Sequence, residues 1–236
     1  MSHIPKQKSD MDAKNEIQDF PICEIGTAHQ VLDNLYASSY PAIPYKNALA
    51  NKFIYKYWNK VGIQVVVNLT QVEEKLGGLM KYEAAWKDID PKVEFIQVGI
   101  KDKNILTDVE LIRVVDDLKT KLANNVKILI HCRQGRGRTA SVCALLLARL
   151  YPDWSSEQIL QHINYCINKR SYRKNTYHKP NPLNPIQLAQ FMRIAFPNNI
   201  KEQNVNNNNS HNLGDTNVTN VVTKTRNTLD QYFLGI

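Results

Sequence analysis

The segment 131–139 contains the residues with the clearest chemical potential. It reads His-Cys-Arg-Gln-Gly-Arg-Gly-Arg-Thr and lies between the apolar runs 128–130 and 142–148. A short glycine-containing loop between a strand and the N-terminus of a helix gathers several backbone N–H groups around one small volume. Gly135 and Gly137 leave no Cβ between those amides and a ligand. We therefore predict a binding site for a tetrahedral oxyanion.

Cys132 begins this loop and Arg138 ends it. The amides, the helix dipole and the neighbouring arginines favour an ionised thiol, and such surroundings lower a cysteine pKa from about 8.5 to roughly 3.5–7.5. The thiolate would attack phosphorus and form a phosphocysteine that water hydrolyses. Arg138 offers a planar fork of donors to two phosphoryl oxygens. We expect Thr139 to donate to the departing sulfur and His131 to hold the loop through its ring N–H groups.

This loop resembles the signature of a known family. His131, Cys132, Arg138 and Thr139 match every defined position of the H-C-x5-R-[S/T] pattern of the cysteine-based protein tyrosine phosphatase superfamily. The length suits its compact dual-specificity branch, and a weaker resemblance covers about residues 30–196. The resemblance implies a phosphatase fold, a single α/β domain with a central, mainly parallel sheet flanked by helices. The loop residues implied to bind substrate are Arg133, Gln134, Gly135, Arg136 and Gly137.

Two features weigh on this interpretation. Ala140 stands where many relatives carry glycine, which we expect to be harmless in the first turn of a helix. The alternative is a glycine-rich turn that only binds an anion, with Cys132 as a core thiol. A structural thiol in the core would not explain the three arginines beside it, so we favour a catalytic cysteine.

A leaving oxygen also needs a proton, which relatives take from an aspartic acid about thirty residues before the cysteine. Asp102 lies 30 residues before Cys132, just after a strand expected over 93–98, where a mobile flap could begin. The Trp-Pro-Asp triplet of the tyrosine-specific branch is absent. Asp108 is the competing candidate, although complementing a helix dipole explains it equally well. We favour Asp102 because an acid on a loop reaches a substrate more easily.

Other polar residues and cysteines have weaker assignments. The segment 184–187, which opens a helix expected over 185–196, resembles the polar segment that flanks the pocket in some relatives, and this resemblance implies that Gln187 could position the hydrolytic water. An exposed residue in a first helical turn is the plain alternative. Cys23, Cys143 and Cys166 have no metal-ligand spacing, so we expect core thiols and neither metal nor cofactor.

The substrate class is open at this stage. Arg133 and Arg136 resemble the basic loop residues of the phosphoinositide-phosphatase branch, yet they would serve equally beside a phosphotyrosine or an RNA 5′ end. We predict a dual-specificity protein phosphatase first, a phosphoinositide or inositol-polyphosphate phosphatase second and an RNA 5′-phosphatase third. A non-catalytic phosphate-binding module remains the alternative, although a binder needs neither thiolate nor acid.

Alternating strand and helix patterns predict the elements that position this loop. Thr107 and Glu110 form a capping box that marks the start of one helix. The expected strands cover 34–37, 64–69, 93–98 and 126–131. The expected helices cover 45–60, 107–123, 139–151, 155–168 and 185–196.

Composition sets the surroundings of the domain. The chain has 236 residues and a net charge of +8, and 158–200 contains no acidic residue, which favours anionic partners. We expect a flexible arm over 1–21, a phosphatase domain over 22–197 and an Asn-rich disordered tail over 198–236. The longest apolar run has seven residues, against about 20 for a membrane span. With no secretory signal visible, we expect a cytoplasmic protein with reduced thiols, and a nuclear location is the alternative.

The tail ends in a possible docking peptide. The segment from Arg226 to Phe233 resembles the short peptides by which replication proteins bind sliding clamps, with Leu229, Tyr232 and Phe233 as apolar anchors. It departs from them at Arg226, where glutamine is usual. An incidental apolar end that packs on its own domain is the alternative.

Overall fold

The computed structural model describes residues 28–41, 48–74, 82–169 and 182–197. Within these ranges, strands form one sheet in the order β1-β2-β5-β3-β4. β1 pairs antiparallel with β2, whereas the other neighbours pair in parallel, which confirms the predicted α/β class. The strands are β1 Ala28–Leu32, β2 Leu35–Ser38, β3 Val65–Asn68, β4 Glu94–Gln97 and β5 Ile128–His131.

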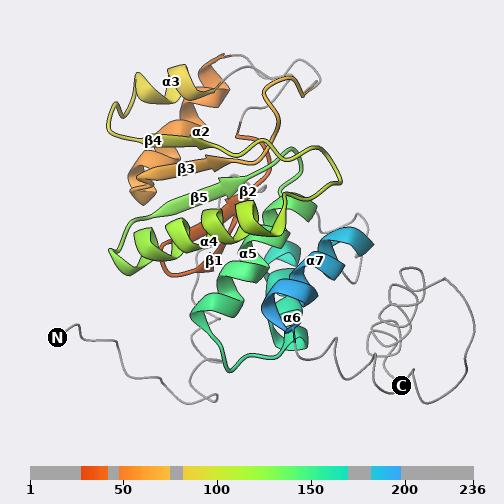
Figure 1. Ribbon diagram of the computed structural model, residues 1–236. Helices are drawn as coiled ribbons and strands as arrows, with labels where there is room; N and C mark the ends of the chain where they lie inside the picture. The colour runs from red at the N-terminus through yellow and green to blue at the C-terminus, as the bar shows by residue number, and fades with distance from the viewer. Residues whose placement is uncertain (1–27, 42–47, 75–81, 170–181, 198–236) are drawn as a thin grey trace, which may run out of the picture.

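Helices cover both faces of the sheet. Figure 1 shows α2 and α3 on one face and α4, α5, α6 and α7 on the other. Every predicted helix is present to within a few residues, and the Thr107–Glu110 capping box is confirmed. The bounds are α2 Ala48–Val61, α3 Glu83–Lys87, α4 Asp108–Ala123, α5 Gly137–Leu150, α6 Ser156–Asn168 and α7 Pro185–Ala195.

The central strands are apolar on both faces because helices cover both. Every residue of β3 and β5 is buried, as expected of parallel strands inside an α/β sheet. Alternation along β3 sends Val65 and Val67 into the core beneath α5 and Val66 into the core beneath α2 and α3.

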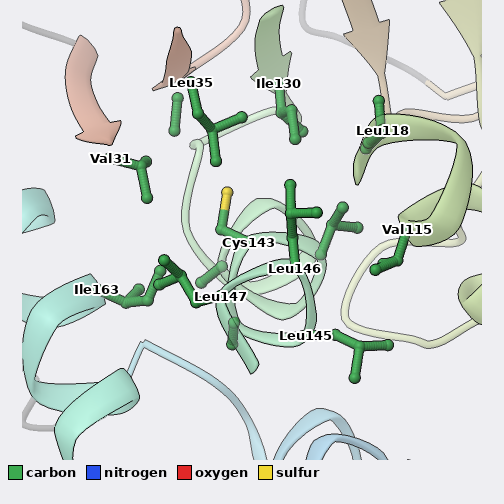
Figure 2. Close-up of a cluster of buried hydrophobic side chains, with 14 of the residues drawn as sticks. Val31, Leu35, Val115, Leu118, Ile130, Cys143, Leu145, Leu146, Leu147 and Ile163 are labelled. Carbon is green, nitrogen blue, oxygen red and sulfur yellow. The ribbon is translucent and has the colours of Figure 1, made fainter. Parts of the chain in front are cut away.

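The larger core surrounds α5. Ten consecutive residues of this helix, 138–147, are buried, so α5 lies inside the domain with other elements on all sides. Figure 2 shows Cys143 and Leu146 of α5 close to Ile130 of β5, with Val115 of α4 beside them. Cys143 and Cys166 are buried, as the sequence predicted, and neither forms a disulfide.

The smaller core is aromatic. Tyr40, Tyr55, Trp58, Tyr82 and Trp86 are all buried on the α2 and α3 side of the sheet. Ring pairs connect Tyr40, Tyr55, Tyr82 and Trp86, and ring centroids lie 5.2 Å apart for Tyr40 and Tyr82. Trp58 instead pairs edge-on with Tyr36 and Tyr57. This aromatic cluster underlies the carboxyl end of β5, where the candidate site begins.

Two elements escaped the sequence analysis. β1 carries only one β-branched residue, Val31, and is an edge strand, so its pattern was weak. Asn34, with φ 63°, makes the tight turn that returns the chain from Leu32 to Leu35. α3 has five residues, too few for a helical period to be recognised.

Several expectations concern parts of the chain that the structure does not describe. The arm 1–21, the tail 198–236, Cys23 and the peptide from Arg226 to Phe233 all lie outside the described residues. Among the helices that are described, none has the length and apolar character needed to cross a membrane.

Candidate active site

The predicted loop joins β5 to α5 at the carboxyl edge of the sheet. Gly135 has φ +62°, a left-handed conformation. A Cβ at this position would collide with the backbone carbonyl of Ser38, at the end of β2, so glycine is required there. The Tyr40 N–H donates to the Arg133 carbonyl at 3.2 Å, which fastens the loop to the same segment. These two contacts attach the loop to the chain at the end of β2, the strand that pairs with β5.

Cys132 lies at the base of this loop and is only 3% exposed. The Gly135 N–H donates to Cys132 Sγ over 3.2 Å, and the N-terminus of α5 follows directly. An N–H donor and a helix N-terminus both stabilise negative charge on sulfur. The structure therefore places Cys132 at the base of the loop and beside the N-terminus of α5, where the sequence analysis expected it.

Arg138 is buried and held by two segments from neighbouring strands. Its terminal nitrogens donate to both carboxylate oxygens of Glu74, at 2.6 and 3.0 Å, and to the Ile100 carbonyl at 2.9 Å. Hydrogen bonding from Arg138 lowers the pKa of Glu74 below its usual value. These hydrogen bonds fix the plane of the Arg138 guanidinium beside the loop.

Glu74 is a site residue that the sequence analysis missed. It lies six residues beyond β3, the parallel neighbour of β5, and carboxyl ends of parallel strands meet at one edge of the sheet. The acidic pair Glu73 and Glu74 after a buried strand was the available signal. Only the fold, however, brings Glu74 rather than Glu73 onto Arg138.

Asp102 reaches the same edge from the segment after β4. Its Oδ1 lies 3.1 Å from Arg138 Nη2 and accepts the Lys103 N–H at 3.0 Å, while half of the side chain stays exposed. The segment that follows is hydrogen-bonded to α7 through the Lys103 and Asn104 carbonyls, which argues against a freely moving flap. The structure therefore brings Asp102 to the loop, as predicted.

Asp108 is engaged elsewhere. It is the first residue of α4, and both of its carboxylate oxygens accept from Arg193, at 2.7 and 2.8 Å. Hydrogen bonding from Arg193 lowers the pKa of Asp108. Both oxygens of Asp108 are thus occupied, whereas Asp102 contacts Arg138 and Lys103 through Oδ1 and keeps a half-exposed side chain, which favours Asp102 as the proton donor.

His131 is completely buried between β5 and the aromatic cluster. Its Nε2 is hydrogen-bonded to the Tyr82 hydroxyl, and the Tyr40 ring lies edge-on to it. Burial lowers the pKa of His131 to about 3, although the backbone of Cys132 acts in the opposite direction. With this pKa the His131 ring is neutral at physiological pH and carries one N–H.

Comparison with known families decides what this loop belongs to. A family model described as the DSP-PTPase phosphatase domain of Swiss Army Knife proteins (PTP-SAK) matches residues 54–174, which include β3, α4, β5 and α5. The chain belongs to this phosphatase family. The predicted membership in the dual-specificity branch of the cysteine-based phosphatases is confirmed.

Solved structures support the fold. PTPMT1 is 18% identical, with a TM-score of 0.53 over 76% of this chain and 99% of that one. Tk-PTP in its active form is 16% identical, with a TM-score of 0.52 over 72% and 96%. A mouse putative dual specificity phosphatase complexed with zinc tungstate is 16% identical, with a TM-score of 0.50 over 80% and 94%. No curated protein sequence matches the chain.

The remaining predicted residues of the phosphatase loop differ in exposure. Arg133 and Gln134 are exposed, and Arg136 is partly buried, so solvent has access to basic side chains of the loop. Thr139 is buried, and its hydroxyl has no hydrogen-bond partner among the described residues. That hydroxyl is therefore available to a ligand or to sulfur.

Gln187 is buried, not exposed, in contrast to the plain alternative in the sequence analysis. Its Oε1 accepts the Asn184 N–H at 3.2 Å, and its Nε2 donates to the Asn104 carbonyl at 3.2 Å. A Cβ at Gly137 would lie 2.8 Å from Gln187 Oε1, so this side chain packs directly on the phosphatase loop. The described residues contain no cluster of three or more metal-ligating side chains.

Proposed function

We propose that the chain is an active, cysteine-dependent phosphatase that hydrolyses phosphotyrosine and phosphoserine or phosphothreonine in proteins. The observation that carries the proposal is the assembly of Cys132, Arg138 and Asp102 at one edge of the sheet, with Asp102 3.1 Å from the guanidinium. A phosphate-binding module would need the amides and Arg138 alone. The thiol and the acid beside them favour catalysis.

The first half-reaction transfers the phosphoryl group to sulfur. The loop amides and Arg138 bind the phosphoryl oxygens, and a phosphoryl oxygen takes the place of Asp102 on Arg138 Nη2. The Cys132 thiolate forms a P–S bond as the ester P–O bond breaks in line. Asp102, displaced toward the leaving oxygen, donates the proton that makes it an alcohol.

The second half-reaction returns the enzyme to its starting state. Asp102, now ionised, accepts a proton from the attacking water, whose oxygen forms a new P–O bond as the P–S bond breaks. The unpartnered Thr139 hydroxyl donates to the departing thiolate. Gln187, packed on Gly137, helps to position the water. The mechanism needs a reduced thiol, so we place the enzyme in the cytoplasm or nucleus.

The experiment that tests this function compares binding with turnover. Cys132→Ser should abolish hydrolysis of p-nitrophenyl phosphate and phosphopeptides while retaining phosphate-ester binding, because the amides and Arg138 remain. Arg138→Lys should also lose activity, since a single ammonium group cannot reproduce the bidentate pair with Glu74 and bind a phosphoryl oxygen as well. Substantial turnover by Cys132→Ser would overturn the phosphocysteine mechanism.

A phosphoinositide or soluble inositol phosphate is the second candidate substrate. It is favoured by Arg133 and Arg136, which add two positive charges on the accessible side of the loop. One solved relative, PTPMT1, has been crystallised in complex with PI(5)P, with a TM-score of 0.51 and 16% identity. Assays of phosphopeptides, phosphoinositides, inositol phosphates and triphosphate-ended RNA in reducing buffer distinguish the candidates.

A further inference from the structure

A row of polar side chains on α7 holds the segment that follows Asp102. The row has a member at every third position, so its members share one side of the helix. Figure 1 shows α7 beside the end of the sheet where β4 leads into α4. Three amide side chains of the row donate to backbone carbonyls: Asn184 Nδ2 to Lys103 at 2.8 Å, Gln187 Nε2 to Asn104 at 3.2 Å and Gln190 Nε2 to Leu106 at 2.7 Å. The fourth member, Arg193, donates to the Asp108 carboxylate.

The start of α7 has more donors than a helix cap requires. Asn184 Oδ1 accepts the Gln187 N–H at 3.0 Å, and Gln187 Oε1 accepts the Asn184 N–H, so the carbonyl oxygens complete the capping box. Serine at the N-cap would satisfy the helix equally well. Only an amide also presents an NH₂ group to the neighbouring segment. The amide nitrogens therefore serve a contact that capping does not explain.

Burial and backbone geometry show what this contact maintains. Gln187 and Gln190 are 2% and 1% exposed, so water has little access to replace their hydrogen bonds. Lys103 has φ 61°, a left-handed conformation that a lysine adopts only when its surroundings impose it. The Asn184 bond to the Lys103 carbonyl lies at this turn. The residue before Lys103 is Asp102, whose Oδ1 accepts the Lys103 N–H.

The same row also touches the phosphatase loop. Gln187 packs on Gly137 and bonds the Asn104 carbonyl, so one side chain connects the segment after Asp102 to the loop that contains Arg138. This connection would set the distance between the Asp102 carboxyl and a phosphoryl group bound in the phosphatase loop.

We propose that Asn184, Gln187 and Gln190 are positioning residues that hold the Asp102 carboxyl in register with the phosphatase loop. The inference rests on the proposed general-acid role of Asp102. In this role the side chains act through the backbone at 103–106, and only Gln187 has the additional proposed contact with the attacking water. The effect of changing Asn184 should consequently appear only in the step that needs the leaving-group proton.

Asn184→Ser is the sharpest test, because it keeps an N-cap oxygen and removes the Nδ2 donor. The rate should fall roughly 10- to 100-fold for alkyl phosphates such as phosphoserine peptides. It should stay within about twofold for p-nitrophenyl phosphate, whose leaving group needs no proton. The melting temperature should change little. Ser155→Ala, which removes the N-cap of α6 away from the site, is the control for loss of a cap, with no dependence on leaving group.

A double-mutant cycle separates this inference from the function on which it rests. In an Asp102→Asn background, adding Asn184→Ser should cause no further loss on alkyl phosphates, because both changes remove the same proton transfer. Equal loss on both substrates, or full additivity with Asp102→Asn, would overturn the positioning role and leave the acid assignment intact. Absence of any leaving-group effect in Asp102→Asn itself would overturn the acid assignment and the positioning role together.

Discussion

Arg138 and Glu74 form a bidentate ion pair in which two terminal guanidinium nitrogens meet two carboxylate oxygens. Both side chains are largely buried, so solvent screens the pair weakly. With Ile100 and Asp102 as further partners, every terminal nitrogen of Arg138 is engaged. Asp102 is the exposed partner, so in the proposed mechanism it is the one that a phosphoryl oxygen would displace. Glu74 would then remain as the support behind the guanidinium.

Glu74→Gln should therefore weaken every reaction of the site equally. Loss of a charge-assisted pair is worth about 1.5–3 kcal/mol, which corresponds to a roughly 10- to 100-fold decrease in kcat/KM. The value of kcat/KM should fall by the same factor for aryl and alkyl phosphates, because Arg138 would bind the phosphoryl group common to both. Glu73→Gln, an exposed neighbour with the same charge change, should stay within about twofold. A selective loss on alkyl phosphates would instead make Glu74 part of the proton transfer.

The two candidate acids predict opposite outcomes. Asp102→Asn should slow alkyl phosphates about 10² to 10⁴-fold and p-nitrophenyl phosphate far less, since only a poor leaving group needs protonation. Asp108→Asn breaks the contact with Arg193 and should lower stability with no such selectivity. The measurement is kcat for both substrates in both variants. If selectivity followed Asp108 instead, our choice of acid would be wrong.

Gly135→Ala should disable the loop. The left-handed backbone alone costs about 1–2 kcal/mol for a residue with a Cβ, and that Cβ also meets the Ser38 carbonyl. We expect loss of activity together with lower resistance to urea. Gly99→Ala is the matched control, because its Cβ would find no atom nearer than 3.9 Å. Normal activity in Gly135→Ala would show that the loop conformation is not essential.

His131 should make the fold sensitive to mild acid. Its folded-state pKa of about 3 lies below the usual 6.5, so the unfolded chain takes up a proton that the folded chain refuses. The stabilisation is complete above pH 6.5 and is lost as pH falls toward 3, at about 1.4 kcal/mol per pH unit. Urea unfolding between about pH 7 and pH 5 should show this slope, and His131→Asn should reduce it. Burial also lowers the pKa of His162, so His162→Gln serves as a separate comparison.

The basic loop residues should reveal the substrate class. If the substrate carries several phosphates, changing Arg133 and Arg136 together to alanine should alter its rate relative to p-nitrophenyl phosphate by roughly two to four orders of magnitude. For a phosphoprotein, the double variant should lose modest activity, mainly at low salt and on acidic peptides. Equal losses on every substrate would mean that both arginines only maintain the loop.

The sequence predicted most of the fold because its strongest signals are local. The valine run of β3, the apolar α5 and the Thr107–Glu110 box are each readable within a few neighbouring residues. The phosphatase loop is also contiguous, so Cys132 and Arg138 were found together. Glu74 and Tyr82 were not found from the sequence, because their partners lie far along the chain. Glu74 contacts Arg138, 64 positions away, and Tyr82 contacts His131, 49 positions away. Such partners depend on strand order, which local patterns do not encode.

The aromatic cluster also gives this protein optical reporters. The three tryptophans lie on different sides of the sheet: Trp58 and Trp86 are in the cluster, whereas Trp154 stacks on Tyr151 and packs against the α5 core. Indole emission depends on its surroundings, and Trp86 lies 6.3 Å, centroid to centroid, from the Tyr82 ring that bonds His131. Single-tryptophan versions would therefore report separately on the aromatic layer beneath His131 and on the opposite layer, without any attached dye.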